Sequence, residues 1–275
     1  MKILRRLMKS LLPAPALRRI QLGRAAHALF ETYYGRKVRA IRPTVLATGE
    51  THNFTYDLCE RNLRYLAETI AIATGLSPSQ AEAYICEGMN DTTLRAHVLA
   101  DHKMPPRDLV SPFGRRLGWY AIARAIKPGV IVETGVERGH GALILCAALM
   151  RNAAEGKPGR YLGTDIDPKA GRLLSGPYAA MGKVLYGDSL QSLAALNESI
   201  DLFVNDSDHS ADYEYQEYHA VAQKLSQRAI ILGDNAHVTD KLALFSRETG
   251  RNFLFFREEP KNHWYPGAGI GISFP

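Results

Sequence analysis

The stretch VIVETGVERGHGALIL, residues 130–145, decides the fold of this chain. Its first three residues are apolar and β-branched, which is typical of a buried strand. Gly135, Gly139 and Gly141 follow, and glycines let a backbone turn sharply and approach a ligand closely. The apolar run after them predicts a helix over 139–151. Taken alone, this turn is also compatible with a plain strand-to-helix loop.

Beyond residue 115 the sequence alternates short apolar runs with helical stretches. Apolar strands separated by helices indicate a sheet whose two faces are both covered. We therefore predict an α/β fold: a Rossmann-like, doubly wound sheet of seven strands, the last antiparallel, with an N-terminal helical extension. The predicted strands are 130–134, 161–165, 183–186, 201–205, 228–232, 252–256 and 268–274, and the predicted helices are 115–125, 139–151, 168–181, 189–196, 210–224 and 237–248.

Acidic residues stand where the predicted strands end. Asp165 ends the second strand, Asp188 follows the third and Asp206 follows the fourth. Ligands of open α/β sheets bind outside the carboxyl ends of the strands. An acid at the end of the second strand can accept hydrogen bonds from both hydroxyls of a ribose. These positions predict one nucleoside-binding crevice.

The charges around the glycine-rich turn indicate which ligand this crevice holds. The pyrophosphate of a dinucleotide favours a helix N-terminus free of carboxylates, because it is itself anionic. Here Glu133 and Glu137 flank the turn. Acids suit a ligand with a sulfonium and an ammonium and no phosphate. The sequence therefore favours S-adenosylmethionine over NAD.

Four motifs, taken as a set, resemble those of class I S-adenosylmethionine-dependent methyltransferases. Two segments within them, ETGV and DSDHS, resemble the motifs of a bacterial subgroup of these enzymes that acts on small molecules. The resemblance covers about residues 115–275 and leaves the N-terminal part uncovered. The motifs are VIVETGVERGHG (130–141), GTDIDP (163–168), YGDS (186–189) and DLFVNDSDHS (201–210).

This resemblance implies a set of cofactor-binding residues. It places Glu133, Gly135 and Gly139 at the methionine end, and it gives Asp165 to the ribose. The other predicted cofactor residues are Asp188 and Ser189 near the adenine, Glu137 beside the turn, and Asp206.

The ends of the fourth and fifth strands suggest a metal site. Asp206 and the pair Asp234-Asn235 would meet at one edge of the sheet, and their oxygens could hold Mg²⁺. The grouping is similar to that of catechol and caffeoyl-CoA O-methyltransferases, in which a Lys stands three positions after the first Asp. Here that position is His209. The resemblance implies that the metal binds an acceptor hydroxyl and that His209 takes its proton, with Asp206 also catalytic.

Each of these assignments has a plainer alternative. Asp206 could bind the methionine amine instead of a metal. Asp234 and Asn235 could cap the helix that follows, and His209 could do the same for the helix at 210. The sequence does not choose between these alternatives.

The N-terminal arm, residues 1–43, is strongly basic. It has eleven Lys and Arg residues and one acid, a net charge of +10, so residues 44–275 carry −4. Residues 2–12 have an apolar and a basic helical face, typical of peripheral contact with an anionic membrane. A tail, a helix against a partner subunit, or an organelle transit peptide are alternatives. The basic charge lies outside the predicted catalytic domain, so nucleic acid is a disfavoured partner.

The cysteine spacing and the apolar runs of the sequence predict a cytoplasmic enzyme. Residues 44–112 are predicted to form a helical cap before a methyltransferase domain at 113–275. The three cysteines have no CxxC spacing, which disfavours a zinc site or a disulfide framework. No secretory signal or membrane-spanning run is predicted.

The sequence predicts transfer of a methyl group to a small acceptor, with a hydroxyl oxygen as the expected site, by a protein that could form homo-oligomers. A nucleotide-dependent oxidoreductase or hydroxylase-like enzyme is one alternative. A non-catalytic, membrane-associated protein that binds S-adenosylmethionine is another. The identity of the acceptor is not predicted.

Overall fold

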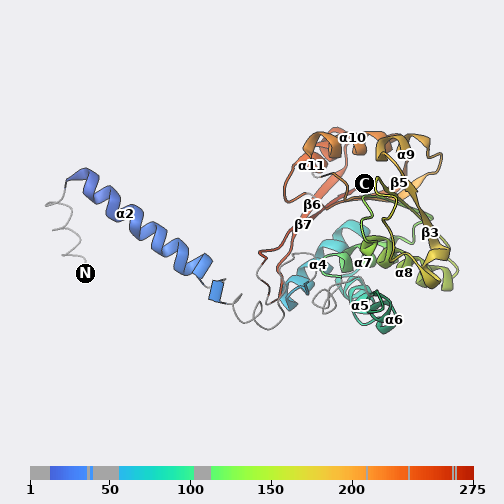
Figure 1. Cartoon of the computed structure of the whole chain (residues 1–275), viewed down its shortest axis with the longest axis horizontal. Coiled ribbons are helices and arrows are strands. Elements are labelled where there is room, and N and C mark those ends of the chain that lie inside the picture. Colours follow the sequence, from blue (N-terminus) through green and yellow to red (C-terminus); the bar gives the residue numbers. More distant parts are fainter. Residues whose placement is uncertain are drawn as a thin grey trace. The chain divides into compact units, whose positions relative to one another are not determined.

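The computed structural model describes residues 13–35, 38–39, 56–101, 113–208, 210–234, 236–261, 263 and 265–275 (Figure 1). The chain divides into two compact units, which are described separately. The first unit is Met1–Thr51 with Asn262–Trp264, and the second is His52–Lys261 with Tyr265–Pro275.

The described part of the first unit is helical. Helix α2 spans Ala14–Leu29 and continues into a π-helical turn, Phe30–Tyr34. Pro13 stands at its N-cap and Pro15 in its first turn, where a missing backbone N–H costs nothing. The predicted amphipathic helix at 2–12 lies outside the described residues.

The second unit is built on one seven-stranded sheet in the order β3-β2-β1-β4-β5-β7-β6. Strand β7 is antiparallel to both of its neighbours, and the β1–β5 pairs are parallel. This confirms the predicted doubly wound sheet with an antiparallel last strand. The strands are β1 Val130–Thr134, β2 Arg160–Asp165, β3 Gly182–Tyr186, β4 Ile200–Asn205, β5 Leu225–Gly233, β6 Asn252–Arg257 and β7 Gly269–Phe274.

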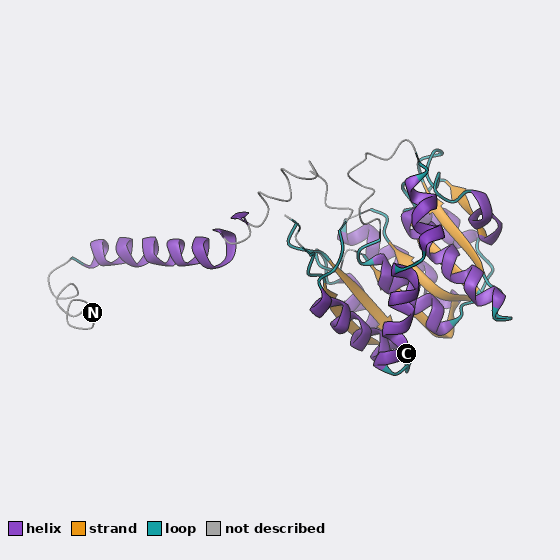
Figure 2. Ribbon diagram, turned by 90° about the horizontal axis from the view of Figure 1, so that it is seen from below, coloured by secondary structure: helices purple, strands orange, loops and turns teal. Residues whose placement is uncertain are grey.

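Helices cover both faces of this sheet, as Figures 1 and 2 show. On one face, Ile131 and Val204 share a hydrophobic cluster with the helices before β2. On the other, Val132 and Phe203 pack with Tyr218 and with the helices after β3. Alternate strand residues thus enter opposite cores. The first face carries α4 Glu60–Thr74, α5 Pro78–Met89, α6 Thr92–Leu99, α7 Arg116–Ile126 and α8 His140–Ala154; the second carries α9 Ser189–Ala195, α10 Ala211–Val221 and α11 Lys241–Glu248.

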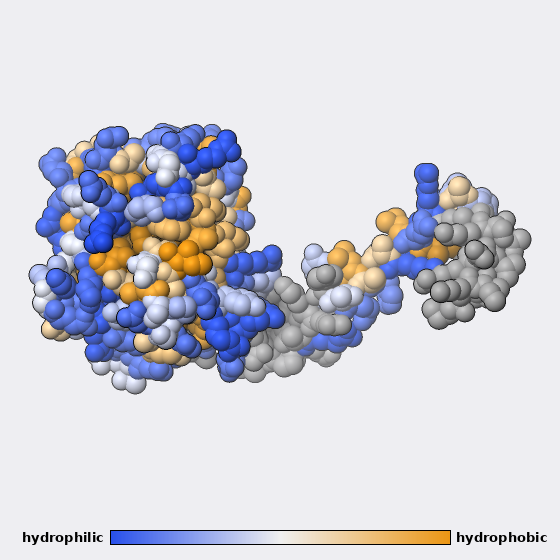
Figure 3. All heavy atoms as spheres, turned by 180° about the vertical axis from the view of Figure 1, so that it is seen from behind, coloured by the Kyte–Doolittle hydropathy of each residue, from blue (hydrophilic) through white to orange (hydrophobic). Residues whose placement is uncertain are grey.

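Helices α4–α6 belong to the same hydrophobic core as the sheet. Leu66 of α4 and Ile85 of α5 are fully buried in the cluster that contains Trp119 of α7. Helix α5 begins with a capping box, in which Ser77 and Gln80 bond to each other's backbone. Apolar side chains also reach the surface of this unit, among them Ile72 of α4, and Figure 3 shows apolar areas on one face.

The predicted helix at 168–181 is wrong. Residues 168–174 form turns, and only a short 3₁₀ segment, Gly176–Met181, follows. Gly171 and Gly176 adopt positive φ angles of 79° and 55°, which interrupt a right-handed helix. Elsewhere, none of the described helices is both long and apolar enough to cross a membrane.

Candidate active site

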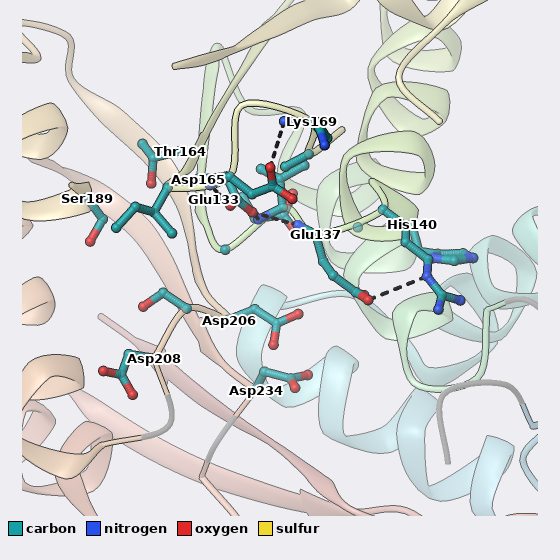
Figure 4. Close-up of a pocket in the computed structure, with 18 of the residues that line it drawn as sticks. Glu133, Glu137, His140, Thr164, Asp165, Lys169, Ser189, Asp206, Asp208 and Asp234 are labelled. Atoms are coloured by element: carbon teal, nitrogen blue, oxygen red, sulfur yellow. Dashed lines mark hydrogen bonds and ion pairs between the residues drawn. The ribbon is translucent and has the colours of Figure 1, made fainter. Parts of the chain in front are cut away.

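A pocket of about 1020 Å³ opens at the carboxyl ends of the parallel strands. Figure 4 shows that carboxylates from several strand ends face it. We call the residues after β1, β2 and β3 the β1–β3 end, and those after β4 and β5 the β4–β5 end. The predicted residues that line the pocket are Glu133, Gly135, Glu137, Asp165, Asp188, Ser189, Asp206 and Asp234.

Backbone hydrogen bonds fix the strand ends to one another. Gly135 N–H donates to the carbonyl of Thr164, and Asp206 N–H donates to that of Thr134, each at 2.9 Å. Asp234 N–H donates to Asn205 in the same way, at 2.9 Å. Each bond extends a parallel ladder one residue past the strand, so the acids enter the pocket from a rigid frame.

The glycine-rich turn depends on the space that Gly135 leaves. Its φ is +80°, and a Cβ there would lie 2.0 Å from the carbonyl oxygen of Asp206. The turn after β1 therefore touches the chain after β4 directly. Gly139, at φ +94°, is the N-cap of α8 and packs against Gly171, so it shapes the turn without lining the pocket.

Asp165 holds the glycine-rich turn in place. One carboxylate oxygen accepts the backbone N–H of Val136 at 2.9 Å and of Glu137 at 2.8 Å. The other accepts the N–H of Asp167 at 2.8 Å. The carboxylate is thereby oriented before any ligand arrives, and the oxygen that bonds Asp167 keeps a lone pair for a further donor.

Glu133 is buried at the base of the pocket, at 1% exposure. Burial raises the pKa of its carboxyl group to about 8, although a hydrogen bond from the Tyr161 hydroxyl and the charge of Arg116 act in the opposite direction. Gly141 makes room for it, because a Cβ there would lie 2.0 Å from a Glu133 carboxylate oxygen. An incoming cation would find a carboxyl group ready to ionise.

Basic groups form another wall of the pocket, beside the N-terminus of α8. Arg116 and His140 are 8% and 7% exposed, and the Arg116 Nε and His140 Nε2 atoms have no hydrogen-bond partner among the described residues. Burial and the charges of Arg116 and Arg138 lower the pKa of His140 to about 3, so its ring is neutral. This wall suits an anionic group such as a carboxylate.

Tyr213 of α10 reaches the end of β3. Its hydroxyl lies 2.8 Å from the Ser189 hydroxyl and donates to Asp188 at 2.9 Å. Asp188 also caps α9 by accepting the backbone N–H of Gln191. This part of the pocket therefore has two anchored polar side chains.

Glu217, one turn after Tyr213, is a buried hub beneath the strand ends. It accepts hydrogen bonds from Thr134 at 3.2 Å, Asn205 at 2.5 Å and Ser207 at 2.6 Å, and also from Ser189. These donors follow or end β1, β3 and β4. A single carboxylate therefore ties three strand ends together.

The β4–β5 end is dominated by ion pairs. Both oxygens of Asp234 accept hydrogen bonds from Arg115, from Nε at 2.5 Å and from an Nη at 2.7 Å. Burial raises the pKa of Asp234, but the Arg115 charge outweighs it and lowers the pKa to about 2. For the neighbouring Asp206, burial and Asp234 raise the pKa despite Arg116, 3.7 Å away.

The predicted magnesium site does not fit this arrangement. Both oxygens of Asp234 are engaged by Arg115, which is itself a buried cation. Among the described residues, no group of three His, Cys, Asp or Glu side chains is placed to hold a metal ion. The predicted ligand Asn235 and the predicted base His209 lie outside the described residues, so both remain predictions.

Sequence reasoning missed several residues of this site. Arg115 is the N-cap and Arg116 the first residue of α7, before β1 and outside any motif. Glu217 resembles a surface residue of an acidic, Tyr-rich helix. The four-residue spacing of Tyr213 and Glu217 was a usable signal, because it places both on one helix face.

Comparison with known proteins agrees with this geometry. Residues 132–236 match the family model described as "Methyltransferase domain". The S-adenosylhomocysteine-bound methyltransferase PaMTH1 of Podospora anserina has a similar fold, with a TM-score of 0.50 and 18% identity, over 71% of this chain and 94% of that one. A methyltransferase of Geobacter sulfurreducens has a TM-score of 0.44 and 20% sequence identity to this chain, over 56% of this chain and 75% of that one. No curated protein matches the chain.

The sheet order and the family match over residues 132–236 support a class I S-adenosylmethionine-dependent methyltransferase. The family match extends over residues 132–236, from within β1 to just past β5.

Proposed function

We propose that this methyltransferase acts on a hydroxyl oxygen of a small acceptor. The observation that carries the choice of cofactor is the charge of the pocket, which is lined by eight Asp and Glu and by five Arg and Lys side chains. An excess of carboxyl groups suits a cofactor with a sulfonium and an ammonium. It disfavours the pyrophosphate of a dinucleotide.

The methionine end of the cofactor has complementary partners in this pocket. Buried Glu133 would hold the ammonium, and the basic wall of Arg116 and His140 would hold the carboxylate. Asp165 would accept a ribose hydroxyl on the oxygen that bonds Asp167, which keeps a lone pair.

The adenine end would lie between β2 and β3. Ile166 is 81% exposed and lines the pocket, so it offers an apolar surface to a base. Asp188 and Ser189, anchored by Tyr213, would supply polar contacts.

When bound, S-adenosylmethionine supplies a methyl group on a positively charged sulfur. The chain's task is to align an acceptor oxygen with that methyl group and to remove its proton. We propose His209 as the base, at the β4–β5 end and next to the pocket residue Asp208. Asp206 would keep the acceptor and cofactor in register.

Calorimetric titration with S-adenosylhomocysteine and with NAD⁺ tests the cofactor. We expect S-adenosylhomocysteine to bind and NAD⁺ not to bind. Binding of NAD⁺ alone would refute the proposal and favour an oxidoreductase.

A methyl-transfer screen with phenols, sugars and amines tests the acceptor class. His209→Ala should slow transfer to a hydroxyl by roughly 10²- to 10⁴-fold while leaving cofactor affinity nearly unchanged. Lys157→Ala, an exposed change remote from the motifs, is the control. Faster transfer to amines than to hydroxyls would contradict the oxygen assignment.

We also propose that the protein is cytoplasmic, that it can self-associate, and that residues 2–12 contact a membrane surface. Co-sedimentation with anionic vesicles, compared with neutral ones, tests the membrane contact. Loss of binding on removing residues 2–12 is the expected result.

A further inference from the structure

Arg115 occupies the place where the sequence predicts a divalent cation. It forms a two-point ion pair with Asp234, whose side chain is 3% exposed, and its own side chain is 10% exposed. A planar guanidinium matches a carboxylate in this two-point geometry, so the pair is specific as well as buried.

The guanidinium is held from its other side as well. Arg115 lies 3.8 Å from Glu258, which is fully buried just after β6. Tyr56 donates a hydrogen bond to Glu258 and lies 3.4 Å from an Arg115 nitrogen. Three segments far apart in the sequence thus converge on one cation, and its burial makes the arrangement rigid.

A divalent cation would compete poorly at this position. It would have to displace Arg115 from Asp234 and deprive a buried guanidinium of its two-point partner, which is strongly destabilising. It would also stand beside a fixed positive charge in a low-dielectric site. The chain's own cation therefore excludes the metal.

We propose that Arg115 replaces the divalent cation at the β4–β5 end, so that this methyltransferase binds its cofactor and acceptor without a metal. The inference rests on the proposed function. It also narrows the acceptor class. A metal site selects two adjacent oxygens that can chelate, whereas a metal-free site requires only one hydroxyl that a base can deprotonate. We expect a phenol or enol with a single reactive hydroxyl.

Manganese binding to the full chain, followed by electron paramagnetic resonance with saturating S-adenosylhomocysteine, tests the replacement. Wild type should bind no Mn²⁺ at concentrations up to about 1 mM, the weak limit of protein sites for hard cations. Arg115→Gln should gain Mn²⁺ affinity by at least about tenfold, because Asp234 becomes available. Adding Asp234→Asn to that variant should remove the gain.

Arg160→Gln, which breaks only an exposed pair with Glu198, is the matched control and should gain nothing. Wild-type Mn²⁺ binding that Asp234→Asn abolishes would overturn the inference. A folded Arg115→Gln protein that gains no Mn²⁺ affinity would also overturn it. So would a gain in Mn²⁺ affinity that persists when Asp234→Asn is added.

Should Arg115→Gln not fold, wild type still decides. S-adenosylhomocysteine affinity and transfer to a monohydroxy phenol should be unchanged between EDTA and Mg²⁺. A loss in EDTA that Mg²⁺ restores would overturn the inference alone. Failure to bind S-adenosylhomocysteine under either condition would instead overturn the proposed function.

Discussion

The two ends of the pocket are built by different means. At the β1–β3 end, positions are set by glycine φ angles and by backbone N–H groups that bond Asp165. At the β4–β5 end, positions are set by buried charges, with Arg115 holding Asp234 across 119 residues of sequence. The comparison teaches that one end is fixed mainly through the backbone, whereas the other is fixed by ion pairs between side chains.

Gly135→Ala should have the largest effect, because it breaks both ends at once. The new Cβ would strike the backbone of Asp206, and φ is +80°. We expect S-adenosylhomocysteine binding to weaken more than about 100-fold, since misplaced sites of this kind lose about that factor. Gly156→Ala is the control: its φ is +75°, but nothing lies within 4 Å. Equal losses in calorimetry would mean that backbone strain alone, and not the contact with Asp206, explains the effect.

Glu133→Gln tests the β1–β3 end through the proton that the Glu133 carboxyl group releases when a ligand binds. The Glu133 pKa is raised to about 8 by burial, so the carboxyl is protonated at pH 7. A ligand ammonium beside it lowers that pKa, and binding should release up to one proton at pH 7 and almost none above about pH 9. The variant should release none and bind about tenfold more weakly. Calorimetry in phosphate and Tris measures the release, and identical heats for wild type would contradict it.

The Glu133 carboxyl group should also make the free energy of unfolding depend on pH. Glu133 has a folded pKa of about 8 against an ordinary 4.5, so folding takes up a proton between those values. Wild-type stability should fall as pH rises through that window, and Glu133→Gln should flatten the fall. Glu137→Gln, an exposed change, should not. Denaturant unfolding at pH 5 and pH 8 measures the difference.

Glu217→Gln should loosen both ends moderately. The amide nitrogen would face donors such as Asn205 and Ser207 in place of an acceptor oxygen. An unsatisfied buried group costs about 1–3 kcal/mol, and we expect that loss in unfolding free energy. Glu248→Gln, at an exposed Tyr215 contact, is the control. Stability unchanged in Glu217→Gln would show that the hub is dispensable.

Tyr213→Phe should give the smallest effect and should be confined to the β1–β3 end. It removes one hydroxyl that bonds Ser189 and Asp188. One hydrogen bond contributes about 1 kcal/mol, so we expect roughly fivefold weaker binding of S-adenosylhomocysteine. Tyr215→Phe removes a hydroxyl bonded to exposed Glu248 and should change nothing. A larger loss for Tyr215→Phe would refute the assignment.

The sequence predicted what local rules govern. The strand before Gly135 and the antiparallel last strand follow from periodicity, and both are confirmed in the structure. Asp165 ends β2 and lines the pocket as its position predicts, and its role toward a cofactor stays a prediction. The helix at 168–181 failed because two positive-φ glycines outweigh its apolar spacing. Arg115 and Glu217 could not be predicted, because their partners are set by tertiary packing alone.

A seam joins the start of α4 to the residues at the end of β6 and just after it. Leu58 pairs with Pro260, and the Asn62 side chain bonds the backbone of Arg257 and Glu259. This seam fastens the residues that hold Arg115 in place. A fragment that begins at residue 113 would therefore lose Tyr56 as well as helices α4–α6, and with Tyr56 a contact that positions Arg115 and Glu258. Fragments for crystallography should begin before Tyr56.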